Sequence, residues 1–307
     1  MHLTPLPILK PWALAPGATI GIVAPASPFK KDELEQGMGI LQHMGFHVRL
    51  SEGLFDARGY LAGEDHQRAD RLLAMFSDPD VDAVMCARGG YGSMRILPLL
   101  DYEMIRAHPK PFVGFSDISA LHHAIFMKTG MVTFHGPVVC SLGQVEDSSR
   151  IMLRQALCGQ LPRAVVAPAM RPLLPGAAEG RLAGGNLTVL CHLLGTAFAP
   201  CFSGCILFIE DCGESLYRID RMLTQMKLAG CFEGLGGIIL GSFKDCGAEA
   251  DIYILVTQIF EGCRVPIVAG LPAGHADSNW TLPLGANARL DADKAELIFL
   301  ESAAIER

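Results

Sequence analysis

The sequence predicts a protein of the α/β class with two domains: an N-terminal domain built on a parallel sheet covered by helices, and a smaller C-terminal α+β domain rich in strands. Three observations predict this fold. The chain has 307 residues, half of them hydrophobic, which suffices for two cores of ordinary size. Strand and helix patterns alternate through the first half. Strands become more frequent in the second half, after a stretch rich in proline.

The N-terminal domain is expected to span residues 1–160. Short apolar or β-branched runs predict its strands, at 19–25, 47–53, 81–87 and 110–115. Polar or amphipathic stretches between them predict its helices, at 31–43, 64–78, 94–100 and 118–128.

A linker is expected at residues 161–180, which are rich in proline and alanine and show no helix or strand period. The C-terminal domain then spans residues 181–307. Its expected strands lie at 205–211, 236–243, 265–272, 281–291 and 295–301, and its expected helices at 187–194 and 215–228.

The composition argues against several classes of function. The net charge of −7 argues against a protein that binds nucleic acid through its phosphates. Glycine, proline or charge interrupts every apolar run before the roughly 20 residues that a membrane-spanning helix needs. The first 17 residues contain four prolines and lack the pattern of a signal peptide, so a cytoplasmic protein is expected.

The ten cysteines indicate neither a disulfide framework nor a metal site. They are scattered along a long chain, several within apolar stretches, which favours buried free thiols. Cys201, Cys205 and Cys212 come nearest to a cluster, but no C-x-x-C pair and no spaced histidine pair completes a zinc site. We therefore expect no metal and no cofactor.

Ser116 lies where an apolar strand, Lys110 to Phe115, runs into a helix. A serine at such a turn presents its hydroxyl above the sheet edge, and the amides at the helix start can stabilise an oxyanion. Serine followed by aspartate is also what helix capping requires, and this segment alone favours the cap. The G-x-S-x-G motif of α/β-hydrolases is absent, which argues against that fold.

A glycine-rich loop, Arg88-Gly89-Gly90-Tyr91-Gly92, also follows a strand and precedes a helix. Its glycines would let the backbone approach a ligand closely, and the Gly90 amide is a candidate oxyanion donor. A tight turn is the alternative. The dinucleotide fingerprint fails because Arg95 stands where its third glycine belongs, and no G-K-[ST] motif occurs.

The second half offers three further candidates. Glu210 and Asp211 end an apolar strand, where a carboxylate can orient a catalytic histidine or merely face solvent. His275 lies in a loop bounded by glycine and proline, the kind of segment where catalytic groups concentrate. Asn186, after two glycines, caps a helix or lies in a cleft.

In this order the segments resemble the LD-carboxypeptidase family, which includes the muramoyl-tetrapeptide carboxypeptidases and the microcin-C immunity peptidases. The resemblance runs nearly end to end. Seven short motifs carry it: GIVAPAS at 21–27, ARGGYG at 87–92, GFSD at 114–117, HGP at 135–137, GGNL at 184–187, IED at 209–211 and GH at 274–275.

The resemblance implies a serine peptidase with Ser116 as nucleophile, His275 as base and Glu210 orienting that base. It further implies an interdomain active site, a homodimer, and release of terminal D-alanine from murein tetrapeptide, as in peptidoglycan recycling. The amides of Gly90 and Asp117 are expected to hold the oxyanion. Arg88, Tyr91 and Asn186 are expected to contact the substrate.

Two alternatives stay open. The same residues could act on a peptidyl-adenylate of the microcin type, with Trp280 stacking on the base or simply packing. The protein could instead bind a small molecule without catalysis, with Ser116 as a cap.

Overall fold

The structure is a computed structural model that describes residues 6–306, so the first five residues of the proline-rich start and Arg307 lie outside it. The chain divides into two compact units, each with its own sheet, which confirms the expected fold class. The first unit is Met1–Leu161, Trp280–Gly285 and Ser302–Arg307, and the second is Pro162–Asn279 and Ala286–Glu301. No helix within the described range is long and apolar enough to cross a membrane.

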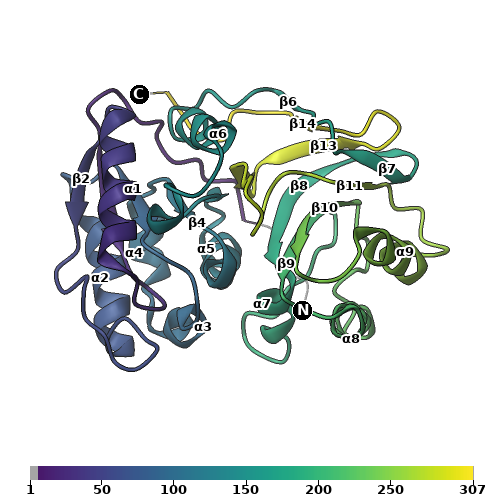
Figure 1. Cartoon of the computed structure of the whole chain (residues 1–307), viewed down its shortest axis with the longest axis horizontal. Helices are drawn as coiled ribbons and strands as arrows, with labels where there is room; N and C mark the ends of the chain where they lie inside the picture. Colours follow the sequence, from purple (N-terminus) through teal and green to yellow (C-terminus); the bar gives the residue numbers. More distant parts are fainter. Residues whose placement is uncertain (1–5, 307) are drawn as a thin grey trace. The chain divides into compact units, whose positions relative to one another are not determined.

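A six-stranded sheet forms the centre of the first unit (Figure 1). The strands lie in the order β12-β5-β4-β3-β1-β2, and only β12 is antiparallel to its neighbour. They are β1 (Thr19–Val23), β2 (His47–Leu50), β3 (Ala83–Cys86), β4 (Phe112–Gly114), β5 (Thr133–His135) and β12 (Leu282–Leu284). Burial of nearly every residue of β1, β3, β4 and β5 is typical of parallel strands covered on both faces.

Within the described residues, the first unit contains six α-helices and three short 3₁₀ turns. The helices are α1 (Lys31–His43), α2 (Asp65–Ser77), α3 (Ser93–Ile96), α4 (Tyr102–Ala107), α5 (Ser119–Thr129) and α6 (Asp147–Leu157). The turns are η1 (Leu97–Leu99), η2 (Ser116–Ile118) and η3 (Val139–Ser141). The strand order reverses between β1 and β3, and ligands of such sheets bind at the carboxyl ends of the strands beside this reversal.

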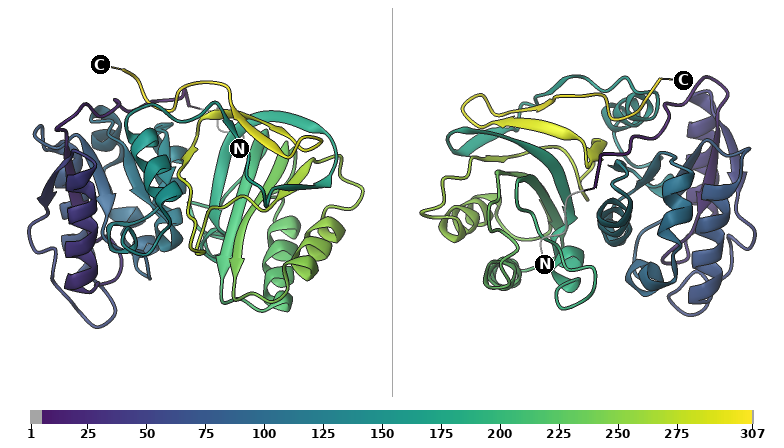
Figure 2. Two further views of the ribbon diagram at one scale, coloured as in Figure 1. Left: turned by 45° about the horizontal axis from the view of Figure 1, so that its top comes forward. Right: turned by 180° about the vertical axis from the view of Figure 1, so that it is seen from behind.

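The second unit contains a curled eight-stranded sheet in the order β6-β14-β13-β8-β9-β10-β11-β7 (Figure 2). Its strands are β6 (Ala164–Val165), β7 (Arg171–Leu174), β8 (Ala177–Asn186), β9 (Cys205–Cys212), β10 (Gly237–Lys244), β11 (Ile267–Ala269), β13 (Asn287–Asp291) and β14 (Glu296–Phe299). The four central strands, β8 to β11, are parallel, and the outer pairs are antiparallel.

Helices α7 (Leu187–His192), α8 (Leu216–Leu228) and α9 (Glu249–Ile259) share one hydrophobic core with β9 and β10. Leu207 and Ile209 of β9 belong to this core. Because side chains alternate along a strand, Glu210 points to the opposite face of the sheet, and Asp211 points to the helix side. Two adjacent carboxylates therefore leave the end of β9 from opposite faces, although both reach the side-chain amide of Asn186.

Two expectations for this part of the chain were wrong. Residues 161–180, expected to be a linker, contain β6, β7 and the start of β8. β6 and β7 are the two edge strands, where proline is tolerated, so Pro172 lies in β7 opposite Val268. The single strand expected at 281–291 is two strands in different sheets, separated at Gly285, whose φ is +98°.

Candidate active site

Ser116 lies one residue beyond the end of β4, after Phe115, and is the first residue of the turn η2. Its backbone is left-handed, with a φ of +64°, a conformation that costs a serine about 1–2 kcal/mol. A helix-capping residue has extended backbone instead, and no capping hydrogen bond from this side chain is present. The half-buried Ser116 is thus a strained turn residue and not a simple cap.

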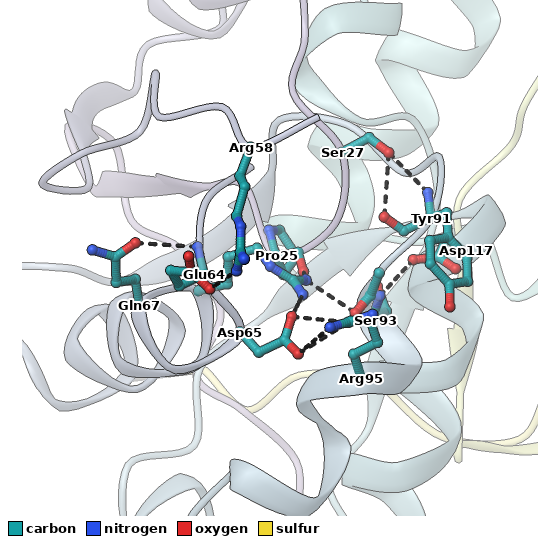
Figure 3. A network of polar contacts seen from close by, with 12 residues as sticks. Pro25, Ser27, Arg58, Glu64, Asp65, Gln67, Tyr91, Ser93, Arg95 and Asp117 are labelled. Carbon is teal, nitrogen blue, oxygen red and sulfur yellow. Dashed lines mark hydrogen bonds and ion pairs between the residues drawn. The ribbon is translucent and has the colours of Figure 1, made fainter. Parts of the chain in front are cut away.

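The glycine-rich loop lies against Ser116. A Cβ atom placed on Gly89 would lie 3.0 Å from the Ser116 Cβ and 3.4 Å from the Asp117 nitrogen, so a larger residue here would have to displace its neighbours by a few tenths of an ångström. Ser27, after β1, stabilises the loop, because its Oγ accepts a hydrogen bond from the Tyr91 amide at 2.9 Å (Figure 3). The structure therefore gathers Ser116, Gly90 and Asp117 into one neighbourhood of the first unit.

Asp117 anchors the same loop through its side chain. The buried carboxylate accepts a hydrogen bond from the Ser93 amide at 2.7 Å. Burial raises the pKa of Asp117 above its ordinary value, and the hydrogen bonds from the Ser93 backbone and side chain oppose that rise in pKa. The sequence shows no sign of this contact, because it joins residues 24 positions apart.

Arg88 and Tyr91 are exposed residues of the loop. Arg88 donates from Nη1 to the Pro28 carbonyl at 3.1 Å. The Tyr91 ring, 48% exposed, lies 5.7 Å from the ring of Tyr60. Contact of either side chain with substrate stays a prediction.

The second unit holds the expected carboxylate and histidine together. His275, in the loop after β11, lies with its Nδ1 2.7 Å from Oε2 of the fully buried Glu210. Burial alone would lower the pKa of His275, but the hydrogen bond with Glu210 and the charges of Glu210 and Asp211 outweigh it, and the pKa lies above its ordinary value. The buried carboxylate thus orients the imidazole and favours its protonated form.

Asn186 links the two carboxylates of β9. Its Nδ2 donates to Glu210 at 3.2 Å and to Asp211 at 3.1 Å, while its Oδ1 accepts from the Val189 amide and caps α7. Asp211 also accepts two hydrogen bonds from Thr188. The cap expected at Asn186 is therefore present, and its amide also supports Glu210.

The serine at a strained strand-to-helix turn and the carboxylate–histidine pair are groups that acyl-transfer hydrolases use. Comparison with known families agrees with this class. Residues 20–136 match the LD-carboxypeptidase N-terminal domain, and residues 179–290 match the LD-carboxypeptidase C-terminal domain. The chain belongs to the LD-carboxypeptidase family, which confirms the resemblance and the expected enzyme class.

Individual relatives match over nearly the whole chain. A putative carboxypeptidase of Streptomyces coelicolor is 41% identical, with 94% of this chain and 96% of the relative covered. A probable murein peptide carboxypeptidase of Bacillus subtilis is 38% identical, with 94% of each covered. MccF, a microcin C7 self-immunity protein known from Escherichia coli, was solved in complex with glutamyl sulfamoyl guanosine; it superposes with a TM-score of 0.90 at 28% identity, covering 97% of this chain and 100% of MccF.

Proposed function

We propose that this protein hydrolyses the amide bond between an L-configured centre and a terminal D-alanine in murein tetrapeptide, with Ser116 as nucleophile. The observation that carries the proposal is the 2.7 Å contact of His275 Nδ1 with buried Glu210. With Nδ1 donating to the carboxylate, Nε2 carries the lone pair that can accept a proton. The family and the murein peptide carboxypeptidase of Bacillus subtilis support the substrate class.

The reaction would proceed in two acyl transfers. Ser116 Oγ attacks the carbonyl carbon while its proton passes to His275 Nε2, giving a tetrahedral oxyanion. His275 then protonates the amide nitrogen, the carbon–nitrogen bond breaks, and D-alanine leaves. Water, deprotonated by His275, attacks the ester on Ser116 and releases the tripeptide. The proposal requires Ser116 Oγ and His275 Nε2 to come within hydrogen-bond distance in the working enzyme.

The amides of Gly90 and Asp117 are proposed as the oxyanion donors. Gly90 belongs to the loop that lies against Ser116, and Asp117 is the residue after the nucleophile, at the start of a helical turn. A single donor of this kind contributes about 3 kcal/mol of transition-state stabilisation.

The test is incubation of the purified protein with L-Ala-γ-D-Glu-meso-diaminopimelate-D-Ala, with D-alanine followed by mass spectrometry. Release by the wild type and its loss in Ser116→Ala are expected. Release that persists in a folded Ser116→Ala protein would refute Ser116 as the nucleophile. No release by the wild type would refute the substrate.

A peptidyl-adenylate is the second candidate substrate, because MccF was solved with a nucleoside-linked glutamyl compound. One contact argues against Trp280 as a free base-stacking platform: its indole N–H donates to Ser148 Oγ at 3.2 Å, and its side chain is half-buried. The same assay with a peptidyl-adenylate in place of the tetrapeptide decides between the two substrates.

We further propose that the enzyme is a cytoplasmic homodimer acting in peptidoglycan recycling. The family resemblance supports the dimer, and a substrate released from murein supports the location. Light scattering on the purified protein gives the mass of the assembly, and cell fractionation gives its compartment; a monomer or a secreted protein would contradict this part of the proposal.

A further inference from the structure

Arg68 of α2 is a buried cation, with 1% of its surface exposed, inside the first unit. It makes one ion pair: its Nη2 lies 2.5 Å from Oδ1 of Asp65, one turn earlier on the same helix. Burying a guanidinium is costly, and an apolar side chain of similar volume would often be as stable or more stable. This position therefore requires an explanation other than core packing.

The other contacts of Arg68 are with the segments that follow β1 and β3, and the second of these is the glycine-rich loop that lies against Ser116. Its Nη1 donates to the Pro25 carbonyl, at the end of β1, and to the Gly92 carbonyl at 2.9 Å, at the end of the glycine-rich loop. Figure 3 shows the surroundings of this network, with Asp65, the first residue of α2, hydrogen-bonded to Arg95. One side chain thus joins the segments that follow β1 and β3, on the two sides of the strand-order reversal.

The peptide group between Gly92 and Ser93 is held at both of its polar atoms. Arg68 binds its carbonyl oxygen, and the Asp117 carboxylate accepts its N–H. A Cβ atom on Gly92 would lie 2.9 Å from Arg68 Nη1, so the guanidinium fills the space that the glycine leaves. The position of this peptide is therefore determined by one residue of α2 and by the residue next to the nucleophile.

We infer that Arg68 is a positioning residue of the reaction, which holds the Arg88–Gly92 loop at Ser116 so that its amides face the developing oxyanion. Arg68 acts through the Gly92 carbonyl and touches no reacting atom. Its neighbour Asp65 orients the guanidinium and is itself held by Arg95, with Arg95 Nη2 at 2.8 Å from Asp65 Oδ2.

The inference rests on the proposed function for its kinetic readout. Loss of a contact that only positions catalytic amides should lower kcat and leave KM nearly unchanged. Displacement of such groups by about 1 Å can cost on the order of 100-fold in rate.

The experiment compares Arg68→Met with Arg71→Met, a matched control on the same helix whose guanidinium pairs with Asp56 and contacts neither loop. We expect kcat for the tetrapeptide to fall about 10- to 100-fold in Arg68→Met with KM within about twofold, and both constants to stay near wild type in Arg71→Met. Arg68→Lys, which retains the charge and part of the donation, should recover part of kcat.

Hydrogen exchange supplies a readout that does not depend on activity. Amides of residues 89–93 should exchange faster in Arg68→Met and at the wild-type rate in Arg71→Met. If the wild type releases no D-alanine, the proposed substrate fails, while this exchange comparison still decides whether Arg68 holds the loop.

Several outcomes would overturn the inference. A folded Arg68→Met protein with wild-type exchange or wild-type kcat would do so, as would an equal loss of kcat in Arg71→Met. If Arg68→Met does not fold, Asp65→Asn carries the test, with a smaller fall in kcat expected at unchanged KM; an unchanged kcat there would count against the inference.

Discussion

The two units present their functional groups by different means. Around Ser116, the first unit uses backbone: a serine with a φ of +64° and glycines that allow close approach. Around His275, the second unit uses side chains: a carboxylate, an amide and an imidazole joined by hydrogen bonds of 2.7 to 3.2 Å. The first arrangement should be sensitive to added atoms, and the second to isosteric changes that alter hydrogen bonding.

The largest effect is expected for the nucleophile. Ser116→Ala should lower kcat by about 10⁴-fold or more, because it removes the attacking oxygen while the oxyanion donors and substrate contacts remain. Steady-state assay of D-alanine release at saturating tetrapeptide measures it. A fall of less than tenfold would assign the chemistry to another residue.

The next effect tests the side-chain arrangement. Glu210→Gln keeps the shape of the side chain but removes the charge that orients His275, and kcat should fall by about 10³- to 10⁴-fold. Activity requires neutral His275, whose pKa is raised in the wild type, so the acid limb of kcat/KM should lie above about 6.5 and move to lower pH in the variant. An acid limb that does not move would contradict the assignment of His275 as base.

The same pair links stability to pH. Because the folded pKa of His275 is raised, the pair stabilises the native state fully below the unfolded pKa of about 6.5, and this contribution is lost as pH rises through the folded value. The wild type should have a larger free energy of unfolding than Glu210→Gln, and this difference should shrink with rising pH. Urea titrations at a series of pH values measure it, and a constant difference would argue against the raised pKa.

The backbone arrangement is tested by adding one carbon. Gly92→Ala should lower the free energy of unfolding by about 2–4 kcal/mol, since φ is +135° and the new Cβ would lie 2.8 Å from Leu61. Gly39→Ala is the control, because Gly39 lies in α1 with no atom within 4 Å of its Cβ position, and there a gain of about 0.5–1 kcal/mol is expected. Equal effects in thermal or urea unfolding would contradict this account.

The smallest effect compares two helix caps. Asn186→Ala should cost about 1–3 kcal/mol, because it removes the cap of α7 and the link between two buried carboxylates. Asp101→Ala, which removes the exposed cap of α4, should cost about 1 kcal/mol and leave kcat unchanged. If both variants retain full activity, the hydrogen bond from Asn186 to Glu210 does not contribute to catalysis.

Most of the first unit could be predicted from the sequence, and less of the second. Parallel strands are buried on both faces, so β1, β3 and β4 appear as apolar runs. β8 is rich in alanine and glycine, with Gly180 and Gly184 against neighbouring backbone, and such a strand has no β-propensity pattern. β7 is a proline-containing edge strand, which resembles a linker until its partner is known.

At the site, local patterns could identify Glu210, His275 and Ser116 as candidates, because each follows or ends an apolar strand. No local pattern could identify the role of Arg68. It lies on the buried face of α2 with Leu72 and Met75, but the carbonyl groups that it binds are distant in the sequence. Contacts of this kind join residues 24 and 43 positions apart, beyond the reach of a sequence window.

Residues 280–285 belong to the sheet of the first unit although they follow the second unit in the sequence, and this affects how the units can be expressed separately. An expression fragment that stops at Leu161 would lack β12, and β5 would become an open sheet edge with unpaired amides and carbonyls. Open edges of buried strands invite association with other chains. The N-terminal half should consequently be insoluble when made alone. Appending residues 280–285 and 302–306, the two other segments of this unit, through short linkers should recover it.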